Sequence, residues 1–388
     1  MIDRIQAALR AYGLQGWLFF DHHLRDPLAY RILQLPTNIE ATRRWYYFVP
    51  AEGDPRKLVH KIESGMLDSL PGRKALYSRW TEQKTKLASM LDGTSPVAMQ
   101  YSPQCAIPYI ALVDAGTVEL VRGLGIEVCS SANLVQEFEA RLNRAQYESH
   151  KEAGKLVDQV RRQAFQLAGQ RIRASDSLNE YQLQQFVLRR FSELNLQCDH
   201  GPIVAVNANA SDPHYEPTVD KHSLIRSGDL LLLDMWAKLN QCEAIYYDIT
   251  WTGFCGDVVP DQITNVFEIV RDARRAACEL VQQSVSSGRN LAGWQVDDAA
   301  RLSIERAGFG EYFFHRTGHS IGTEVHGNGA NMDNFESHDE RTILPDTCFS
   351  IEPGIYLPDF GIRSEVNVFV SHSSAEVTGE QQDKIIRV

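Results

Sequence analysis

The sequence lacks the features of a secreted or membrane-bound protein. Its seven cysteines are an odd number, are scattered, and include no Cys-x-x-Cys pair, which argues against a disulfide framework and against a structural zinc site. The N-terminal segment has no apolar core of the kind that a secretory signal requires. No apolar run approaches the roughly 18 residues of a membrane span. We therefore expect a reduced, cytoplasmic protein without membrane contact.

Excess positive charge is also missing. The chain has 39 Lys and Arg against 50 Asp and Glu, a formal net charge of −11, and this charge opposes a general affinity for nucleic-acid phosphates. One basic stretch, residues 271–275, lies in a predicted helix and is flanked by acids, which is typical of a solvated helix face. The sequence therefore predicts no nucleic-acid partner.

What is present is enough apolar sequence for two folded domains. The 388 residues, with 43% hydrophobic and 23% charged, have an ordinary globular composition and exceed the usual size of one core. Short strands alternate with helices up to about residue 145, which predicts an α/β domain at 1–145. Long helices, over 134–174 and 178–194, then precede short strands and turns. This order predicts an α+β domain with an antiparallel sheet at 146–388, and we place the junction near Ala145, inside the first long helix.

Two carboxylates lie on predicted strands of the second domain. Asp234 ends a run of four leucines, and an ionised carboxylate after a buried run needs a strong partner. Asp248 lies among β-forming residues, where period-two alternation places it on one face with Tyr246 and Thr250. Either aspartate alone is more often an ordinary strand-end residue.

The segment HRTGHSIGTEVHGNG concentrates histidine and glycine. His315, His319 and His326 are a quarter of the twelve histidines in the chain, and four glycines are interleaved with them. Glycine lets the backbone approach a ligand closely, and imidazole binds metals or transfers protons. A single histidine here would be an ordinary core or surface residue, whereas the cluster favours a functional site.

A predicted hairpin, SIEPGIYLPDFGIRSEVNV, carries two glutamates. Alternation in its second strand places Arg363, Glu365 and Asn367 on one face. Glu352 would face Glu365 across the hairpin, and the two would repel unless a cation lay between them. Simple charge pairing at an exposed hairpin would explain the same residues.

These acids and His319 together offer four carboxylates and one imidazole, enough ligands for two hard-to-borderline divalent ions. Two metal ions about 3.5–4 Å apart can lower the pKa of a shared water and polarise a carbonyl. Hydrolysis is therefore the expected reaction.

The ordered set Asp234, Asp248, His319, Glu352 and Glu365, within the motifs DxW, DIT, HxxGHxIGxxVH, EPGIY and RSE, resembles the pita-bread metallopeptidases, which include methionine aminopeptidases, proline aminopeptidases and prolidases. The HxxGH pattern and the upstream Pro-His-Tyr resemble the branch that acts at proline. The resemblance implies a pita-bread catalytic domain after a creatinase-like N-terminal domain, a homodimer, and two divalent ions that could be Mn, Co, Zn or Fe. It also implies hydrolysis of the Xaa-Pro bond in a peptide or dipeptide with proline second, by attack of a metal-bridging hydroxide.

The resemblance also implies roles for individual residues. Asp234 would hold one metal, Asp248 and Glu365 would bridge both, and His319 with Glu352 would complete the other. Glu352 would move the proton, and His326 would stabilise the oxyanion. The substrate would be oriented by His214 and His315, and Arg363 would pair with a metal-binding or substrate carboxylate.

The chain departs from the family pattern at Trp236 and Trp251, and its two aspartate ligands stand further apart than is common. These departures affect the expected substrate preference more than the chemistry. The sequence leaves open whether the substrate is a dipeptide, as for a prolidase, or a longer peptide, as for an aminopeptidase. A non-peptidase of the same fold, such as a creatinase-like hydrolase or a binding module, is also compatible with the sequence. So is a metal-dependent lyase or amidase that acts on a different small substrate.

Overall fold

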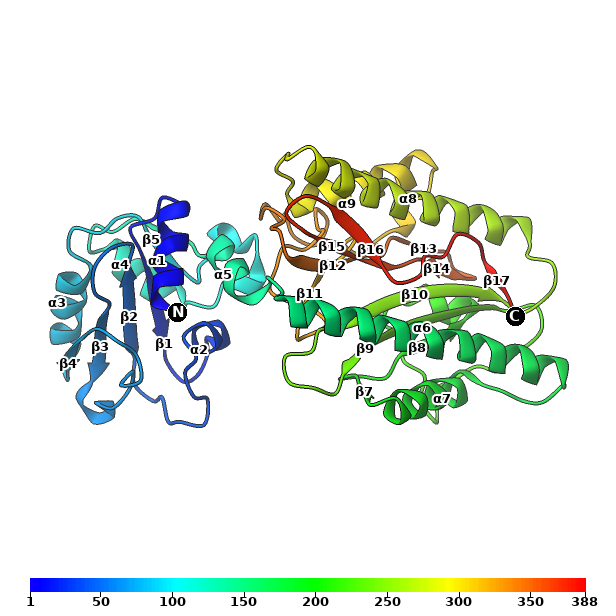
Figure 1. Cartoon of the computed structure of the whole chain (residues 1–388), viewed down its shortest axis with the longest axis horizontal. Helices are drawn as coiled ribbons and strands as arrows, with labels where there is room; N and C mark the ends of the chain where they lie inside the picture. Colours follow the sequence, from blue (N-terminus) through cyan, green and yellow to red (C-terminus); the bar gives the residue numbers. More distant parts are fainter. The chain divides into compact units, whose positions relative to one another are not determined.

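The computed structural model describes all residues from Met1 to Val388. The chain divides into two compact units, Met1–Glu139 and Ala140–Val388, which are drawn from blue to cyan and from green to red in Figure 1. The junction predicted near Ala145 lies in the first turn of a helix of the second unit. None of the helices combines the length and the apolar composition that a membrane-spanning helix requires. All seven cysteines are free thiols.

The first unit is built on a mixed six-stranded sheet with the strand order β4-β3-β2-β1-β5-β6. Its strands are β1 (Gly16–Asp21), β2 (Trp45–Pro50), β3 (Arg56–His60), β4 (Arg73–Tyr77), β5 (Val97–Met99) and β6 (Val128–Ser130). Its helices are α1 (Ile2–Ala11), α2 (Pro27–Ile32), α3 (Trp80–Leu91), α4 (Ala115–Arg122) and α5 (Ala132–Glu139). The predicted mixture of strands and helices is therefore present.

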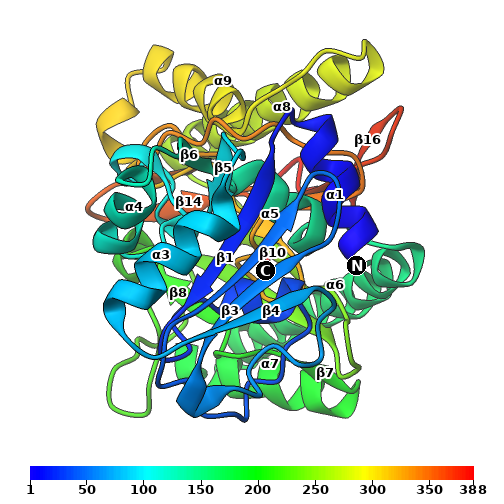
Figure 2. The ribbon, with the colours of Figure 1, turned by 90° about the vertical axis from the view of Figure 1, so that its left-hand side faces the viewer.

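The two faces of this sheet pack against different helices, because alternate residues of a strand point to opposite faces. Trp17 and Phe19 of β1 pack in one core with residues of α1, α2 and α5. Leu18 and Phe20 pack in the other core with residues of α3 and α4. Figure 2 shows α1 on one side of the strands and α3 and α4 on the other.

Helix α2 begins at a buried carboxylate whose charge affects stability. Asp26 Oδ1 accepts a hydrogen bond from the Ala29 amide at 3.0 Å, whereas Oδ2 is buried without a partner. Burial raises the pKa of Asp26 from 3.8 to about 7. Because the folded-state pKa lies above the unfolded value, the contribution to stability is complete below about pH 4 and is lost as the pH rises through 7.

Asp26→Asn is expected to remove this pH dependence, because asparagine stays neutral and keeps an oxygen that can accept from Ala29. Between pH 4 and pH 8 the free energy of unfolding of the wild type should fall by about 3–4 kcal/mol relative to the variant. Denaturant titration of both proteins at the two pH values measures the difference. An identical pH dependence in the two proteins would contradict the assignment.

The second unit contains long helices and several small sheets. Its helices are α6 (Arg144–Arg173), α7 (Glu180–Glu193), α8 (Asp261–Ser286) and α9 (Gly293–Arg306). Its strands are β7 (Leu196–Gln197), β8 (Ile203–Val206), β9 (Leu230–Leu239), β10 (Tyr247–Phe254), β11 (Ser320–Ile321), β12 (Thr347–Ile351), β13 (Gly354–Tyr356), β14 (Gly361–Arg363), β15 (Val366–Val370), β16 (Ala375–Thr378) and β17 (Ile386–Arg387).

Helices pack against the outer faces of these sheets, and the inner faces of the sheets lie toward each other. The core of α6 and α7 includes Leu233, Ile249 and Trp251 of β9 and β10. The core of α8 and α9 includes residues of β12 to β15. In Figure 1, α8 and α9 lie on one side of the strands and α6 and α7 on the other. The predicted antiparallel pairing holds for β9 with β10 and for β12 with β15.

One predicted helix is interrupted in the structure. The segment 134–174 is interrupted, because Asn143 caps α6 through a capping box with Gln146 and so starts a new helix. Helix α4 begins at Ala115, because the Asp114 side chain accepts from the Thr117 amide at 2.9 Å and caps the helix start. Residues Pro108–Ile110 form a separate 3₁₀ turn.

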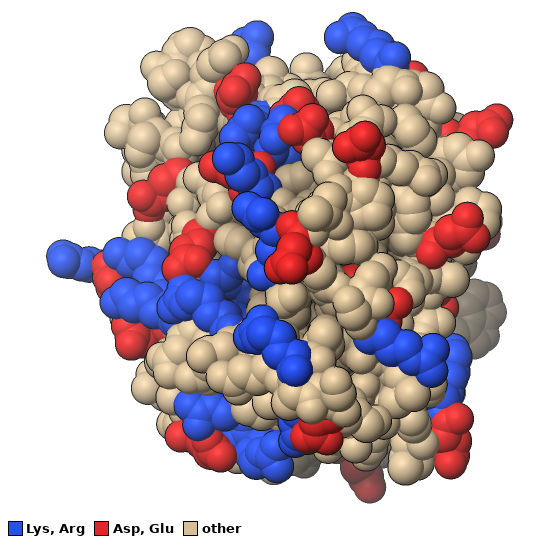
Figure 3. All heavy atoms as spheres, turned by 90° about the vertical axis from the view of Figure 1, so that its right-hand side faces the viewer, with Lys and Arg blue, Asp and Glu red and all other residues tan.

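Charged side chains on the exposed end of the second unit are of both signs. Figure 3 shows a band of Lys and Arg on this face with Asp and Glu interspersed. In the stretch predicted as a solvated helix face, Arg271 pairs with Asp272 at 2.8 Å and Arg275 with Asp383 at 2.8 Å. Arg274 differs from that prediction, because it is buried and donates to Ser364 Oγ at 2.6 Å.

Candidate metal centre

Strands β9 and β10 bring Asp234 and Asp248 to one inner surface. The two strands pair with Thr250 opposite Asp234 and Asp248 opposite Trp236, so the two aspartates lie on the same face of the sheet. The residues that alternate with them pack against α6 and α7. Both carboxylates are buried. The period-two alternation predicted for Asp248 and Thr250 is confirmed by this register.

Glu352 and Glu365 lie where the predicted hairpin is interrupted. Strands β12 and β15 pair as far as Ile351 with Val366, and β13 with β14 starts at Gly354 with Arg363. The hairpin is therefore two short ladders rather than two continuous strands. The glutamates occupy the break between them, where their backbones are free to turn toward β10. The Thr250 hydroxyl donates to Glu365 Oε2 at 2.8 Å.

His319 completes this group from the segment that leads into β11. Its Nδ1 lies 3.2 Å from the Ser320 carbonyl oxygen, and because a carbonyl only accepts, the ring proton is on Nδ1. Nε2 then presents a lone pair at 3.5 Å from Asp248 Oδ2 and 3.4 Å from Glu352 Oε1. Burial lowers the pKa of His319, which keeps the ring neutral and suited to bind a metal.

The close packing of the chain against β12 explains why residue 318 of the motif is glycine. A Cβ atom at this position would lie 2.0 Å from the Ser350 carbonyl oxygen, so only glycine allows the chain to pass β12 this closely. The neighbouring amide of His319 donates to Ser350 Oγ at 3.0 Å. The tight approach therefore places the imidazole beside the glutamate that follows β12.

These residues fit a divalent cation. Ligand atoms of Asp248, His319 and Glu365 all lie within 4.8 Å of one another. Asp248 Oδ1 and Glu365 Oε1 are buried without a hydrogen-bond partner, and such atoms are costly unless a cation compensates them. Burial, together with neighbouring carboxylates, raises the pKa of both Asp248 and Glu365 well above the usual range. Oxygen-rich sites with one imidazole suit divalent metals.

Arg363 is the buried cation of this surface. Its guanidinium forms an ion pair with Asp234, donates from Nε to Thr250 Oγ1 at 3.0 Å, and lies 4.0 Å from Glu352 Oε2. Nη1 donates to the Tyr356 hydroxyl at 3.2 Å. One guanidinium faces the four carboxylates of Asp234, Asp248, Glu352 and Glu365, so ionisation of all four requires positive charge beyond that of Arg363.

The other three histidines predicted for the site, His214, His315 and His326, differ in their exposure and in their contacts. The His326 ring is exposed and lies edge-on to the His319 ring, with centroids 4.4 Å apart. His315 uses both ring nitrogens, Nδ1 at 2.7 Å from the Arg316 carbonyl and Nε2 at 2.7 Å from the Tyr356 hydroxyl. His214 is exposed, and its amide donates to Asp212 Oδ1 at 3.0 Å. His326 therefore contacts His319 directly, and His315 is linked to Arg363 through Tyr356. The His214 ring makes no contact with the five candidate ligand residues.

The two tryptophans that depart from the family pattern lie on opposite faces of the sheet. Trp251 packs against α6, with the Arg161 guanidinium 3.4 Å from its ring centroid. Trp236 lies on the face of the aspartates, and its Nε1 donates to Asp199 Oδ1 at 2.9 Å. Of the two, Trp236 is therefore positioned to shape the space beside the centre.

Several residues that hold the ligands had no role predicted from the sequence. Asn367 Oδ1 accepts from the Asp248 amide at 3.0 Å, Ser350 Oγ donates to Glu352 Oε1 at 3.0 Å, and Tyr356 links His315 to Arg363. Tyr356 is the last residue of the EPGIY motif, and Asn367 lies on the strand face predicted for Glu365. The motif and the strand alternation could therefore have identified these two residues.

Comparisons with known proteins agree with this geometry. Residues 148–372 match the model of metallopeptidase family M24. An Xaa-Pro dipeptidase of Lactobacillus delbrueckii is 31% identical over 194 residues, 50% of this chain and 46% of that protein. A putative Xaa-Pro aminopeptidase of Mycoplasma genitalium is 30% identical over 179 residues, 44% of each chain. The matched segment thus spans about half the length of these curated relatives.

The likeness in three dimensions extends over the whole chain. A crystal structure of dipeptidase PepE from Mycobacterium ulcerans superposes with a TM-score of 0.67 at 23% identity, covering 100% of this chain and 96% of that one. This match confirms the predicted α+β pita-bread fold. Since the family model covers more than half of the chain and includes all five candidate ligand residues, the protein belongs to metallopeptidase family M24.

Proposed function

We propose that the protein is a metal-dependent exopeptidase that hydrolyses the Xaa-Pro bond and prefers Xaa-Pro dipeptides to longer peptides. The observation that carries this proposal is the convergence of Asp248, His319 and Glu365 ligand atoms within 4.8 Å, beside Asp234 and Glu352. The substrate class follows from relatives that are named Xaa-Pro dipeptidase and Xaa-Pro aminopeptidase. A metal-free creatinase-like hydrolase or a binding module is not favoured, because all five candidate ligand residues are present. A metal-dependent lyase or amidase would keep the same residues, and it is less favoured because the similar proteins are named as Xaa-Pro peptidases.

The five ligand residues would hold two divalent ions. Asp234 would bind one ion, and His319 and Glu352 would bind the other. Asp248 and Glu365 would bind both ions. The unpartnered oxygens of Asp248 and Glu365 support bridging. Bound divalent ions would polarise the scissile carbonyl and lower the pKa of a water. Mn, Co, Zn and Fe all suit this ligand set.

Glu352 is the residue placed to move a proton. Its side chain is 16% exposed, against 7% for Asp248 and 4% for His319, so it is the most accessible of these three groups to water. Burial raises the pKa of Glu352, which favours uptake of a proton by its carboxylate. Ser350 and the more distant Arg363 hold its carboxylate in place.

His326 would donate to the oxygen that becomes negative in the transition state. Replacing it with alanine is expected to lower kcat for an Xaa-Pro dipeptide by about 10²–10³-fold, the usual effect of losing one such donor. His372→Ala is a matched control, since this exposed histidine pairs with Asp346 outside the centre. Steady-state kinetics of both variants test the role. A loss confined to KM would contradict it.

His315 is a positioning residue in this proposal, which revises the role implied by resemblance. Nδ1 carries the ring proton for the Arg316 carbonyl, so Nε2 accepts from the Tyr356 hydroxyl. Tyr356 in turn accepts from Arg363. The ring therefore has no free donor for the substrate, and it acts by orienting Tyr356 and Arg363.

Dipeptide and tripeptide substrates separate the two subclasses. With Mn²⁺ present, kcat/KM should be higher for an Xaa-Pro dipeptide than for the tripeptide extended after proline. A clear preference for the tripeptide would assign an aminopeptidase instead. The homodimer, the cytoplasmic location and the creatinase-like character of the first unit stay predictions.

A further inference from the structure

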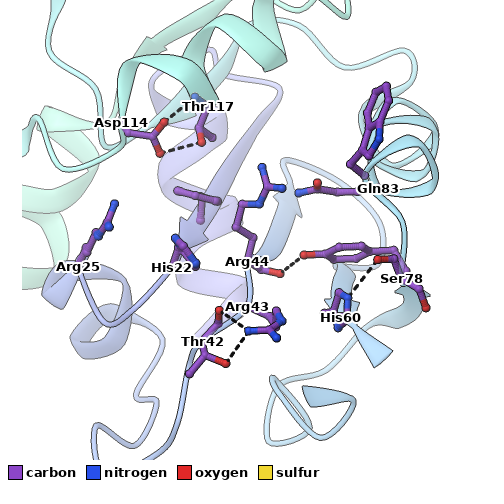
Figure 4. Close-up of a pocket in the computed structure, with 13 residues that line it drawn as sticks. His22, Arg25, Thr42, Arg43, Arg44, His60, Ser78, Gln83, Asp114 and Thr117 are labelled. Atoms are coloured by element: carbon purple, nitrogen blue, oxygen red, sulfur yellow. Dashed lines mark hydrogen bonds between the residues drawn. The ribbon is translucent and has the colours of Figure 1, made fainter. Parts of the chain in front are cut away.

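The first unit contains a basic pocket that the proposed peptidase chemistry does not use. Its cavity volume is about 620 Å³, and its walls come from the ends of β1 and β4, the segment before β2, and α3 and α4. The charged side chains of its lining are Arg25, Arg43 and Arg44, with one carboxylate, that of Asp114, and the polar rings of His22 and His60 lie beside them. Figure 4 shows the Arg44 guanidinium inside this space, beside His22 and directed toward Gln83.

The guanidinium groups of the basic pocket form no ion pair with a carboxylate of the chain, although the Glu63 carboxylate lies close to the Arg43 backbone. Neither Arg25 nor Arg44 makes a side-chain hydrogen bond or ion pair, and Arg43 Nη1 contacts only the neutral oxygens of Thr42, at 3.2 and 3.1 Å. Asp114 is engaged elsewhere, because its oxygens accept from the Thr117 amide and hydroxyl at 2.9 and 2.8 Å. Three guanidinium groups therefore line this pocket without a direct ion pair, with Asp114 and the neighbouring Glu63 as the nearby carboxylates, in a protein whose net charge is −11.

The backbone around these arginines is fixed before any ligand arrives. The buried carboxylate of Asp21 accepts from the amides of Leu24 and Arg25 at 2.9 and 2.7 Å and from the Tyr30 hydroxyl at 2.8 Å. Leu24 has a φ of 55°, a left-handed conformation that persists only where the surroundings impose it.

The second arginine segment is held in a similar way. Glu63 accepts from the amides of Thr42 and Arg43 at 2.9 and 3.1 Å, and the Tyr77 hydroxyl donates to the Arg44 carbonyl at 2.7 Å. Both loops are thus ordered by folding, which lowers the entropy cost of binding an anion.

An aromatic side chain lies on the rim of the basic pocket. Trp80 lines it at the start of α3 and is 72% exposed, which leaves its ring open for stacking. Arginine guanidinium groups bind phosphate oxygens in bidentate geometry, and an indole ring stacks on nucleobases. We propose that the basic pocket binds a nucleoside diphosphate, with its phosphates on Arg25, Arg43 and Arg44 and its base on Trp80. This site goes beyond the proposed peptidase function and does not depend on it.

Calorimetric titration of the full chain with ADP, pyrophosphate and adenosine tests the proposal. ADP should bind more tightly than pyrophosphate, and adenosine should bind least. Arg44→Ala should weaken both ADP and pyrophosphate by about 10–100-fold, as for loss of a charged hydrogen-bond donor. Trp80→Ala should weaken ADP and leave pyrophosphate unchanged.

Two controls separate this site from the metal centre and from general charge. Arg226→Ala removes an exposed arginine of the second unit and should leave binding unchanged. Asp248→Asn alters the metal centre, where phosphates can also bind a metal, and should leave binding unchanged as well. Equal ADP affinity in the wild type and Arg44→Ala, or loss of binding in Asp248→Asn alone, would overturn the proposal. Equal affinity for ADP and pyrophosphate would overturn the nucleotide assignment.

Discussion

Glu352→Gln is expected to lower kcat for an Xaa-Pro dipeptide by about 10²–10⁴-fold, the usual contribution of general acid–base catalysis. Glutamine keeps the shape and the Ser350 contact of Glu352, whose Oε1 lies 3.0 Å from Ser350 Oγ. It cannot take up a proton, so the step that needs one is lost. Steady-state kinetics with Mn²⁺ measure the effect.

Because Glu352 also lies 3.4 Å from His319, the metal content of the variant must be measured alongside its rate. If the variant retains both metal ions and loses activity, the loss is due to proton transfer and not to metal binding. The matched control is Glu340→Gln, since Glu340 is exposed and pairs with His338 outside the centre. Full activity of Glu352→Gln with metal bound would show that another group moves the proton.

Arg363→Gln is expected to destabilise the metal-free protein by about 3–5 kcal/mol, the usual cost of removing one partner of a buried ion pair. The guanidinium is buried and contacts Asp234, Thr250 and Tyr356. Without it, the carboxylates of the centre face one another with no protein cation between them. Denaturant unfolding in the presence of a chelator measures the loss.

Divalent metal should recover part of that loss, because the ions would supply the missing positive charge. The destabilisation is therefore expected to be smaller with Mn²⁺ than with chelator. Arg275→Gln serves as the control, since Arg275 forms a surface pair with Asp383 and such pairs contribute less than about 1 kcal/mol. The same loss in both conditions would show that Arg363 acts through packing and not through charge.

The sequence predicted most of the candidate centre because its ligands follow local rules. Asp234 ends a leucine run on a strand, and alternation sets the face of Asp248. The glycines around His319 indicated close backbone approach, and Gly318 meets that description. The family resemblance added the order of the five residues, and with it the pita-bread fold.

Other features depend on contacts between distant segments, which periodicity does not reveal. The break that places Glu352 and Glu365 together arises from the separate pairing of β12 with β15 and of β13 with β14. Alternation sets the face of Trp251, whereas its contact with the Arg161 guanidinium of α6 comes from a distant segment. The basic pocket joins Arg25, Arg44 and Trp80 from separate loops and a helix start, and no motif links them.

The most direct test of the metal centre is hydrolysis of an Xaa-Pro dipeptide by chelator-treated protein before and after Mn²⁺ is restored. We predict no cleavage without metal and cleavage after Mn²⁺ is added, with two ions bound for each chain. Cleavage that persists after complete metal removal would contradict this mechanism. So would a protein that carries two ions on these five residues and cleaves no Xaa-Pro substrate.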